Sequence, residues 1–224
     1  MKNRTVIIVV GVVVLVLGLA GAAVFFGGDD ESSGGVLAPG ETTGPTYGDD
    51  VQENRPVEVT GDALPSLESV GENDVAIGSP VPVIDGATFD GNAMTIGGAT
   101  DGPTMYVFLA HWCPHCNDEI PELIELNNRG GVPEDMNVVA ISTAVTPGEP
   151  NYPPSEWIVD KDWPSQWPVM ADSVESTSFV VNGGSGFPYL MIVDADGNVL
   201  DRASGTKSAE ELASWIQDAL ATTA

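Results

Sequence analysis

The hexapeptide His111–Cys116, HWCPHC, contains both cysteines and both histidines of the 224-residue chain. Two residues separate Cys113 from Cys116, so both sulfurs can meet within one helical turn and close a disulfide. A CxxC pair can also be half of a zinc site, but this chain has no second CxxC. A purely structural disulfide over so short a span would stabilise little, because it barely constrains the unfolded chain. The motif therefore favours thiol–disulfide redox chemistry.

The apolar pattern around the hexapeptide predicts the elements that position it. Residues 104–110 and 136–143 read as strands buried on both faces of a sheet, and 189–193 as a third strand. Between the first two, residues 116–130 form an amphipathic helix, so a parallel pair with a right-handed crossover is expected. Ser208 and Glu211 form a capping box at the start of a final helix. The fold class is α/β.

Cys113 is expected where the first strand gives way to the helix. A thiol at a helix N-terminus lies near unpaired backbone N–H groups and the positive end of the helix dipole, and both favour the thiolate. The thiolate is the nucleophile in disulfide exchange. We therefore expect Cys113 to be the nucleophile and Cys116 to be the resolving thiol.

The charge of the chain is one-sided, with 33 Asp and Glu against 7 Lys and Arg and a formal net charge of −26. Nucleic acid is excluded as a partner, because no basic stripe is present to displace counterions from phosphates. An acidic membrane surface would repel the chain as well. The acids are spread along the sequence, which indicates a strongly solvated surface and not a cation site.

The N-terminus predicts a membrane anchor. Residues 5–26 carry no charge, and these 22 residues would span roughly 33 Å as a helix, enough to cross a hydrocarbon core of about 30 Å. Lys2 and Arg4 precede the run, so the N-terminus is expected in the cytoplasm and the rest outside. The alternative is a cleaved signal peptide, although the run exceeds the usual apolar length of about 7 to 15 residues.

Three segments are predicted along the chain: an anchor or signal peptide over 1–26, a linker over 27–74 and one domain over 75–224. The linker is rich in Gly, Pro, Ser, Thr, Asp and Glu, and its few apolar residues follow no period. Such a segment is expected to be disordered. Its 48 residues would reach about 35 to 40 Å if flexible.

The domain resembles the thioredoxin-like fold, and within it the exported, membrane-anchored thiol–disulfide oxidoreductases of the TlpA and ResA type. Trp112-Cys113-x-x-Cys116 matches the WCxxC motif of that family, and Pro121 lies where thioredoxins kink the following helix. Residues 186–194, GFPYLMIVD, look like its cis-proline strand. Residues 77–96 are similar to the N-terminal hairpin that TlpA-like members add, and 157–181 to their modest insert before the cis-proline strand. The resemblance implies a central mixed sheet flanked by helices.

The resemblance also implies the remaining site residues and the partners. Pro188 would be a cis-proline opposite the dithiol, and Trp112, Pro114 and Phe187 would border the substrate groove. No cofactor or metal is needed. The partners would be exported proteins with thiols or disulfides, a membrane redox protein that resets the enzyme, and the membrane itself through the N-terminal helix.

Two departures from thioredoxin leave the direction of electron flow open. The buried acid that thioredoxins carry six residues before the first cysteine is replaced here by Val107. The dipeptide Pro114-His115 resembles that of DsbA, and His115 could stabilise the Cys113 thiolate, which would make the disulfide more oxidising. The architecture favours a reductase. The alternatives are a DsbA-like oxidase and a copper- or zinc-binding metallochaperone that uses His111, His115 and the two thiols.

Overall fold

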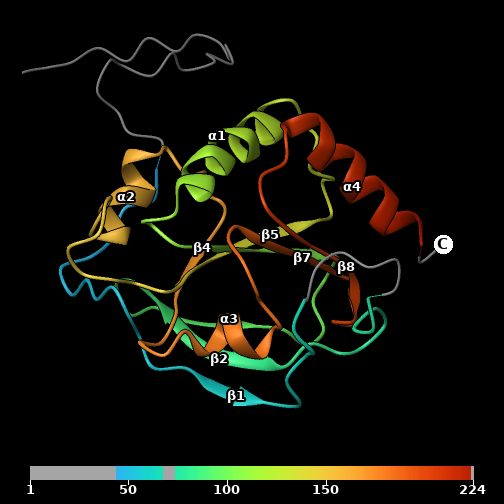
Figure 1. The fold of residues 1–224 in the computed structure, drawn as a ribbon, viewed down its shortest axis with the longest axis horizontal. Coiled ribbons are helices and arrows are strands. Elements are labelled where there is room, and N and C mark those ends of the chain that lie inside the picture. Colours follow the sequence, from blue (N-terminus) through green and yellow to red (C-terminus); the bar gives the residue numbers. More distant parts are fainter. Residues whose placement is uncertain (1–43, 68–73, 223–224) are drawn as a thin grey trace, which may run out of the picture. The chain divides into compact units, whose positions relative to one another are not determined.

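One mixed sheet organises the protein (Figure 1). The computed structural model describes residues 44–67 and 74–222. The strands are β1 (Glu58–Thr60), β2 (Val83–Thr88), β3 (Ala93–Ile96), β4 (Thr104–Leu109), β5 (Asn137–Ser142), β6 (Val169–Ala171), β7 (Tyr189–Val193) and β8 (Val199–Ser204). Their order is β1-β2-β6-β5-β4-β7-β8, with β3 paired to β2 outside this path. The β4–β5 pair is parallel, as predicted, and so is the β5–β6 pair.

The helices lie on both faces of the sheet (Figure 1). They are α1 (Pro114–Asn128), α2 (Pro154–Asp160), α3 (Thr177–Val181) and α4 (Ala209–Ala221). Helices α1 and α4 pack side by side on one face, and α3 lies on the other. The Ser208–Glu211 capping box is present at the start of α4. The fold class and the flanked mixed sheet are as predicted.

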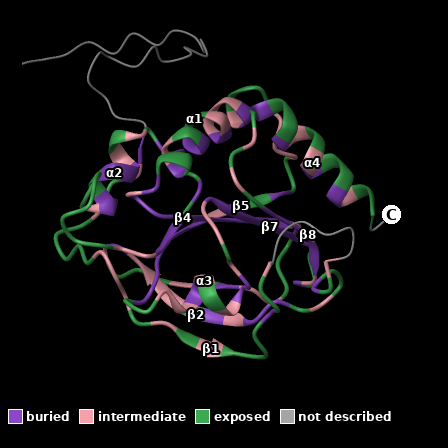
Figure 2. Cartoon of the chain, viewed as in Figure 1, coloured by how far each residue is buried: buried purple, intermediate pink, exposed green. Residues whose placement is uncertain are grey.

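The central strands β4 and β7 are completely buried (Figure 2). Side chains alternate along them, so that Val107 and Leu109 join the core under α1 and α4, whereas Tyr106 and Phe108 join the core on the opposite face. Strands of this kind must be apolar throughout, which explains the continuous runs in the sequence. The two cores fix the position of the loop between β4 and α1.

The predicted N-terminal hairpin and the predicted insert are both present. Strands β2 and β3 form an antiparallel hairpin. The insert contains α2, β6 and α3. Its first helix, α2, begins at Pro154, slightly before residue 157, where the insert was expected to start. Strand β6, which the sequence analysis does not predict, joins β5 to β2 within the sheet. With only three residues it is too short for an alternating pattern to be recognised.

The predicted linker requires a correction, because residues 44–67 pack against the domain. Strand β1 pairs with β2, and the Glu53 carboxylate accepts hydrogen bonds from the Ser155 backbone N–H (2.9 Å) and hydroxyl (2.6 Å) at the start of α2. Asn54 donates to the carbonyls of Asp172 and Ser173. A few apolar residues also pack against the two cores, among them Tyr47 and the buried Leu64. Backbone pairing, polar contacts and these few side chains together fix the segment, although its apolar content is low. The rest of the predicted linker, 27–43 and 68–73, lies outside the described residues.

A buried arginine ties the start of the domain to the sheet. Arg202 on β8 forms an ion pair with Asp74, and its Nη1 donates to the Pro65 carbonyl at 2.9 Å. The guanidinium also lies 3.4 Å from the Tyr189 hydroxyl. Hydrogen bonding to Arg202 lowers the pKa of the Asp74 carboxyl. Breaking one partner of such a pair typically costs about 3 to 5 kcal/mol.

The predicted anchor, residues 5–26, lies outside the described residues. Within 44–67 and 74–222, no helix combines the length and the apolar character needed to cross a membrane.

Candidate active site

Cys113 occupies the N-cap position of α1, directly after the turn that leaves β4. Its backbone N–H donates to the Ala110 carbonyl at 3.0 Å, which closes this turn. Only 6% of the residue is exposed. The Cys113 Sγ lies 3.9 Å from the carbonyl oxygen of Phe187. The sulfur is therefore at a helix N-terminus, as predicted, and faces the start of β7.

Cys116 lies one turn further along α1 and is fully buried. Its Sγ accepts a weak hydrogen bond from the Ala110 N–H at 3.4 Å. Burial raises the pKa of the Cys116 thiol well above its ordinary value, and the nearby Cys113 and Glu119 raise it further. Both cysteines are free thiols. Cys116 is thus a protonated, inaccessible thiol that needs a proton acceptor to react.

Glu119 is a buried acid beside the dithiol that the sequence analysis did not identify. It is 0% exposed and lies one helical turn after Cys116. Its Oε2 accepts a 2.7 Å hydrogen bond from the Lys207 backbone N–H, and its Oε1 has no partner among the described residues. Burial raises the pKa of Glu119 to about 7. The carboxyl can therefore exchange a proton near neutral pH.

The spacing along α1 carries a signal that could have identified Glu119. The buried residues of the helix are Cys116, Glu119, Ile120, Leu123 and Leu126. A residue three positions after Cys116 shares its face, and an acid on an otherwise apolar face is unusual. The sequence analysis searched for the acid only on the preceding strand, where Val107 is buried and apolar.

The segment opposite Cys113 contains the predicted cis-proline. The Phe187–Pro188 peptide bond is cis. Pro188 is buried and Phe187 is half-buried. The Phe187 ring packs edge-on against Trp112, with ring centroids 5.9 Å apart. The Trp112 indole is held by a 2.7 Å hydrogen bond from its Nε1 to the Ala144 carbonyl. Phe187 and Trp112 thus form two rigid, partly exposed borders beside Cys113.

The residues between the two cysteines, Pro114 and His115, are both exposed on the first turn of α1. The His115 carbonyl accepts a 3.4 Å hydrogen bond from the Thr206 hydroxyl. Among the described residues, its imidazole makes no hydrogen bond. The structure thus places His115 beside the dithiol, but among the described residues its ring makes no hydrogen bond to the Cys113 sulfur.

The other histidine of the motif, His111, is fully buried. The Thr146 backbone N–H donates to its Nε2 at 3.1 Å, so Nδ1 must donate to the Pro150 carbonyl, 2.8 Å away. Both ring nitrogens are occupied by backbone groups of the loop after β5. His111 therefore fixes that loop beside the dithiol.

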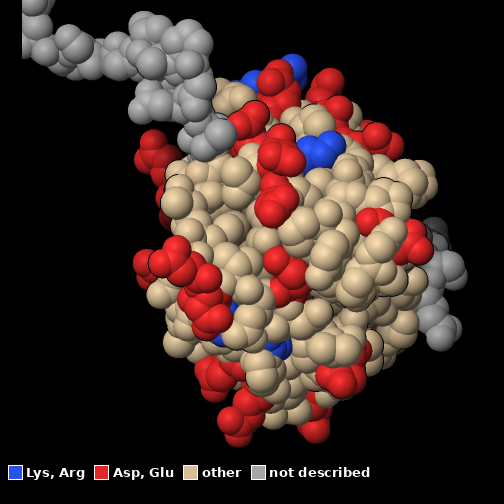
Figure 3. Space-filling view, turned by 90° about the vertical axis from the view of Figure 1, so that its left-hand side faces the viewer, with Lys and Arg blue, Asp and Glu red and all other residues tan. Residues whose placement is uncertain are grey.

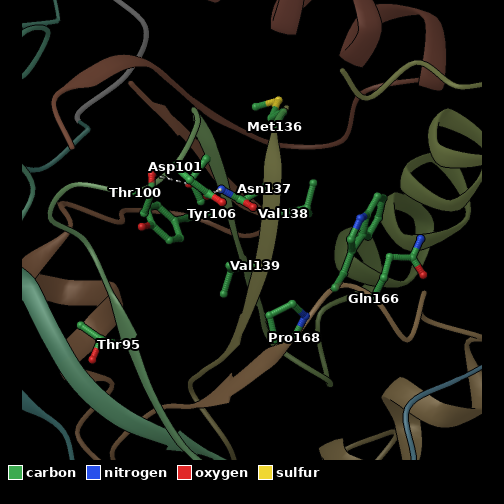
Figure 4. Close-up of a pocket in the computed structure, with 12 residues that line it drawn as sticks. Thr95, Thr100, Asp101, Tyr106, Met136, Asn137, Val138, Val139, Gln166 and Pro168 are labelled. Carbon is green, nitrogen blue, oxygen red and sulfur yellow. Dashed lines mark hydrogen bonds between the residues drawn. The ribbon is translucent and has the colours of Figure 1, made fainter. Parts of the chain in front are cut away.

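The described cavities lie away from the dithiol. One of about 380 Å³ lies at the amino-terminal ends of β4 and β5, and its lining includes Tyr106, Val138, Gln166 and Pro168 (Figure 4). Asn137 donates to Asp101 at its rim, at 3.3 Å. Cys113 follows the carboxyl-terminal end of β4. A dithiol that exchanges with protein disulfides needs an accessible sulfur and not a deep cavity, so we base the site on the thiols.

A comparison with protein families agrees with this fold. The family model described as "Thioredoxin-like domain" matches residues 91–220. A search of curated proteins finds no match. Three solved structures resemble the chain. StoA from Bacillus subtilis is 19% identical, with 63% of this chain and 98% of that chain covered and a TM-score of 0.48. A thiol:disulfide interchange protein of the thioredoxin family from Chlorobium tepidum is 25% identical, with coverage of 63% and 95% and a TM-score of 0.49, and a secreted Mycobacterium tuberculosis disulfide oxidoreductase is 18% identical, with coverage of 60% and 94% and a TM-score of 0.48.

The fold and the paired thiols define the class as a thioredoxin-fold thiol–disulfide oxidoreductase. Because the family model matches more than half of the sequence, the chain belongs to the thioredoxin-like domain family. The predicted fold and family are thereby confirmed.

Proposed function

We propose that the protein is an exported, membrane-anchored reductase that reduces disulfides of other exported proteins. The observation that carries this proposal is the buried Cys116 thiol beside Glu119. A thiol with a raised pKa is a stronger nucleophile and a poorer leaving group, so the Cys113–Cys116 disulfide is favoured over the dithiol and the dithiol is reducing. In the reducing direction Cys116 is the attacking group and Glu119 accepts its proton; in the reverse direction the same carboxyl would return that proton.

In the proposed reaction, the Cys113 thiolate attacks one sulfur of a substrate disulfide. The substrate disulfide breaks, a mixed disulfide with Cys113 forms, and the first substrate thiolate leaves and takes up a proton. The Cys116 thiol then passes its proton to the Glu119 carboxylate and attacks the Cys113 sulfur. The second substrate thiolate leaves, and the enzyme disulfide has formed. The substrate gains two electrons and the enzyme loses two.

The flanking residues have supporting roles in this proposal. Phe187 and Pro188 present a backbone edge opposite Cys113 along which an extended substrate lies, and the Phe187 carbonyl is next to the reacting sulfur. Trp112 and Pro114 border that groove. His115 acts on the Cys113 thiolate only through solvent, because its ring is exposed. A membrane protein that donates two electrons returns the enzyme to its dithiol form.

The proposed location makes a prediction about topology. Because Lys2 and Arg4 precede an uncharged run of membrane length, a reporter fused after Ala224 is expected to be active only outside the cytoplasm. Activity of the fusion inside the cytoplasm would exclude this location. The mass of the protein extracted from membranes separates a retained anchor from a cleaved signal peptide.

The direction of electron flow is tested by the reduction potential, measured by equilibration with glutathione. We expect a value near or below about −270 mV, as in thioredoxin, whereas a value near about −120 mV would indicate an oxidase. The oxidase remains the second candidate because of its DsbA-like Pro114-His115 dipeptide.

The same measurement tests the part of His115. Because its imidazole is exposed and makes no described hydrogen bond, His115→Ala is expected to lower the potential by less than about 30 mV, the equivalent of 1.4 kcal/mol for a two-electron couple. His115→Gln is the matched control for the loss of the ring. A drop much larger than this would mean that His115 stabilises the Cys113 thiolate directly, and would strengthen the oxidase alternative.

The metallochaperone alternative has less support. It requires His111 as a ligand, but both ring nitrogens of His111 are hydrogen-bonded to backbone groups. Binding a metal would require the loop after β5 to release this side chain.

A further inference from the structure

Three aromatic side chains form a continuous row that starts beside the dithiol. Trp112 adjoins Cys113 in sequence and packs edge-on against Phe187. Phe187 in turn stacks on Phe179, with ring centroids 4.5 Å apart and an interplanar angle of 28°. All three residues are partly exposed. The row therefore leads from the nucleophilic sulfur to α3, a helix of the insert.

The far end of this row is held firmly in place. The Phe179 ring also contacts Phe108 and Tyr189, whose centroids lie 6.1 and 6.0 Å away. The buried Asp172 carboxylate accepts hydrogen bonds from the backbone N–H groups of Ser178 and Phe179 at 2.9 and 3.2 Å. A rigid aromatic surface loses little entropy when a partner binds to it.

The loops around Cys113 differ from the rest of the chain in charge. Figure 3 shows acidic side chains spread over one face of the molecule and few basic ones. In contrast, no Asp, Glu, Lys or Arg occurs between Asp101 and Asp118, between Asp135 and Glu149, or between Glu175 and Asp194. Burial explains this for β4, β5 and β7, but not for the loops at their ends. Three segments are involved: residues 110–117, which comprise a turn and the first turn of α1, and the loops 143–148 and 182–188. They carry the dithiol, the Trp112 acceptor Ala144 and Phe187.

We infer that Phe179 extends the substrate surface and selects substrates that carry an uncharged, apolar side chain next to the reacting cysteine. The inference rests on the proposed function, because it concerns the substrate of that same site. An extended segment lying along Phe187 would bring its flanking side chain over the Phe187–Phe179 pair. Apolar contact there is favourable, and the three uncharged segments offer no partner to an acidic or basic side chain. Lys207, in the loop that contacts the start of α1, lies instead over the Trp215 ring.

The test uses a set of peptides, each with one cysteine held in a mixed disulfide. The peptides differ only in the residue next to that cysteine, which is Phe, Ser, Glu or Lys. With the reduced full-length protein, kcat/KM for the Phe peptide is expected to exceed that for the Ser and Glu peptides by about tenfold, the discrimination typical of a small apolar contact. This preference should persist in high salt, because it does not depend on charge. A preference for the Lys peptide that disappears in salt would overturn the inference, since the acidic surface would then be selecting the substrate.

Two variants ask whether Phe179 causes the preference. Phe179→Ser removes the ring, and Gly184→Ala displaces it, because a Cβ at Gly184 would come within 2.2 Å of the Phe179 ring. In both, the Phe-to-Ser ratio of kcat/KM should fall to about twofold, and the use of a ratio cancels any general loss of activity. Val75→Ser is the control, because Val75 is 77% exposed and its turn bonds to the start of β8, away from the dithiol.

The outcomes separate this inference from the proposed function. If the reduced protein reacts with none of the peptides and with no small disulfide, the proposed function fails. If all the peptides react at similar rates, or if either folded variant keeps the full preference, only the role of Phe179 fails. If Phe179→Ser does not fold, the wild-type preference together with Gly184→Ala still tests the role of Phe179.

Discussion

Cys116→Ser protein is expected to accumulate covalent mixed disulfides with its substrates, whereas Cys113→Ser protein should form none. The structure gives the reason. Cys113 lies at the N-terminus of α1 with its sulfur next to the Phe187 carbonyl, whereas Cys116 is buried behind it. A substrate sulfur can reach only the first of these. Without Cys116 the mixed disulfide cannot be resolved, and it persists.

The measurement is non-reducing electrophoresis followed by mass spectrometry of the trapped species. We expect Cys113→Ser to lower kcat/KM on the order of a thousandfold or more, as is typical when a covalent nucleophile is removed. The double variant Cys113→Ser/Cys116→Ser is the control for non-specific association. Equal trapping by the two single variants would contradict the assignment, because it would mean that the sulfurs are equally accessible.

Glu119→Gln is expected to slow the resolution of the mixed disulfide by about 100-fold, within the usual range for loss of a general base. Because burial raises the pKa of Glu119 to about 7, the wild-type resolution rate should rise with pH through a midpoint near that value. The variant should lack this midpoint. Stopped-flow measurement of substrate thiol release from the mixed disulfide at several pH values tests both points.

Glu119 should also make the stability of the reduced protein depend on pH. A carboxyl whose pKa is higher in the folded state than in the unfolded state favours folding while it is protonated, and this contribution is lost as the pH rises through the folded pKa. A rise from 4.5 to about 7 corresponds to on the order of 3 kcal/mol. Glu119→Gln should therefore unfold at higher denaturant concentration than the wild type at pH 8, and at a similar concentration at pH 5.

Glu122→Gln is the matched control for both measurements. Glu122 lies on the same helix and also accepts a backbone hydrogen bond, from the Ala209 N–H at the start of α4, at 2.8 Å. It is not adjacent to Cys116 on the buried face. A pH profile altered equally by both substitutions would show that the loop contact, and not a proton acceptor beside Cys116, is the cause.

Much of the domain was predictable because its decisive features are local. The continuous apolar runs of β4 and β5, the CxxC at a strand-to-helix junction and the Ser208–Glu211 box each lie within a short window of sequence. The position of Phe187–Pro188 opposite the thiols came from the family resemblance, since nothing local connects residue 188 to residue 113. Long-range pairing of this kind depends on the whole fold.

The features that were missed depend on contacts between distant segments. In the sequence, Glu119 is one acid among many. Its burial becomes evident only when α1 is packed against the sheet. Residues 44–67 read as linker because their partners, such as Ser155 and Asp172, lie about a hundred residues further along. A composition rule counts apolar residues within a segment, so it cannot detect a segment held by hydrogen bonds to another part of the chain.

Strand β2 has a consequence for aggregation that follows from its neighbours in the sheet. It pairs with β1, β3 and β6, and it ends at Thr88, before the family match begins at residue 91. A fragment cut at that boundary would lose β2 and expose the unpaired edge of β6, whose residues are all buried in the intact protein. Unprotected apolar edges recruit strands from other copies. In the intact chain β2 covers this edge of β6, and β3 pairs with the opposite edge of β2. On β1, Glu58 faces Asp85 of β2; these like charges cost some pairing energy but discourage another molecule from adding a strand there.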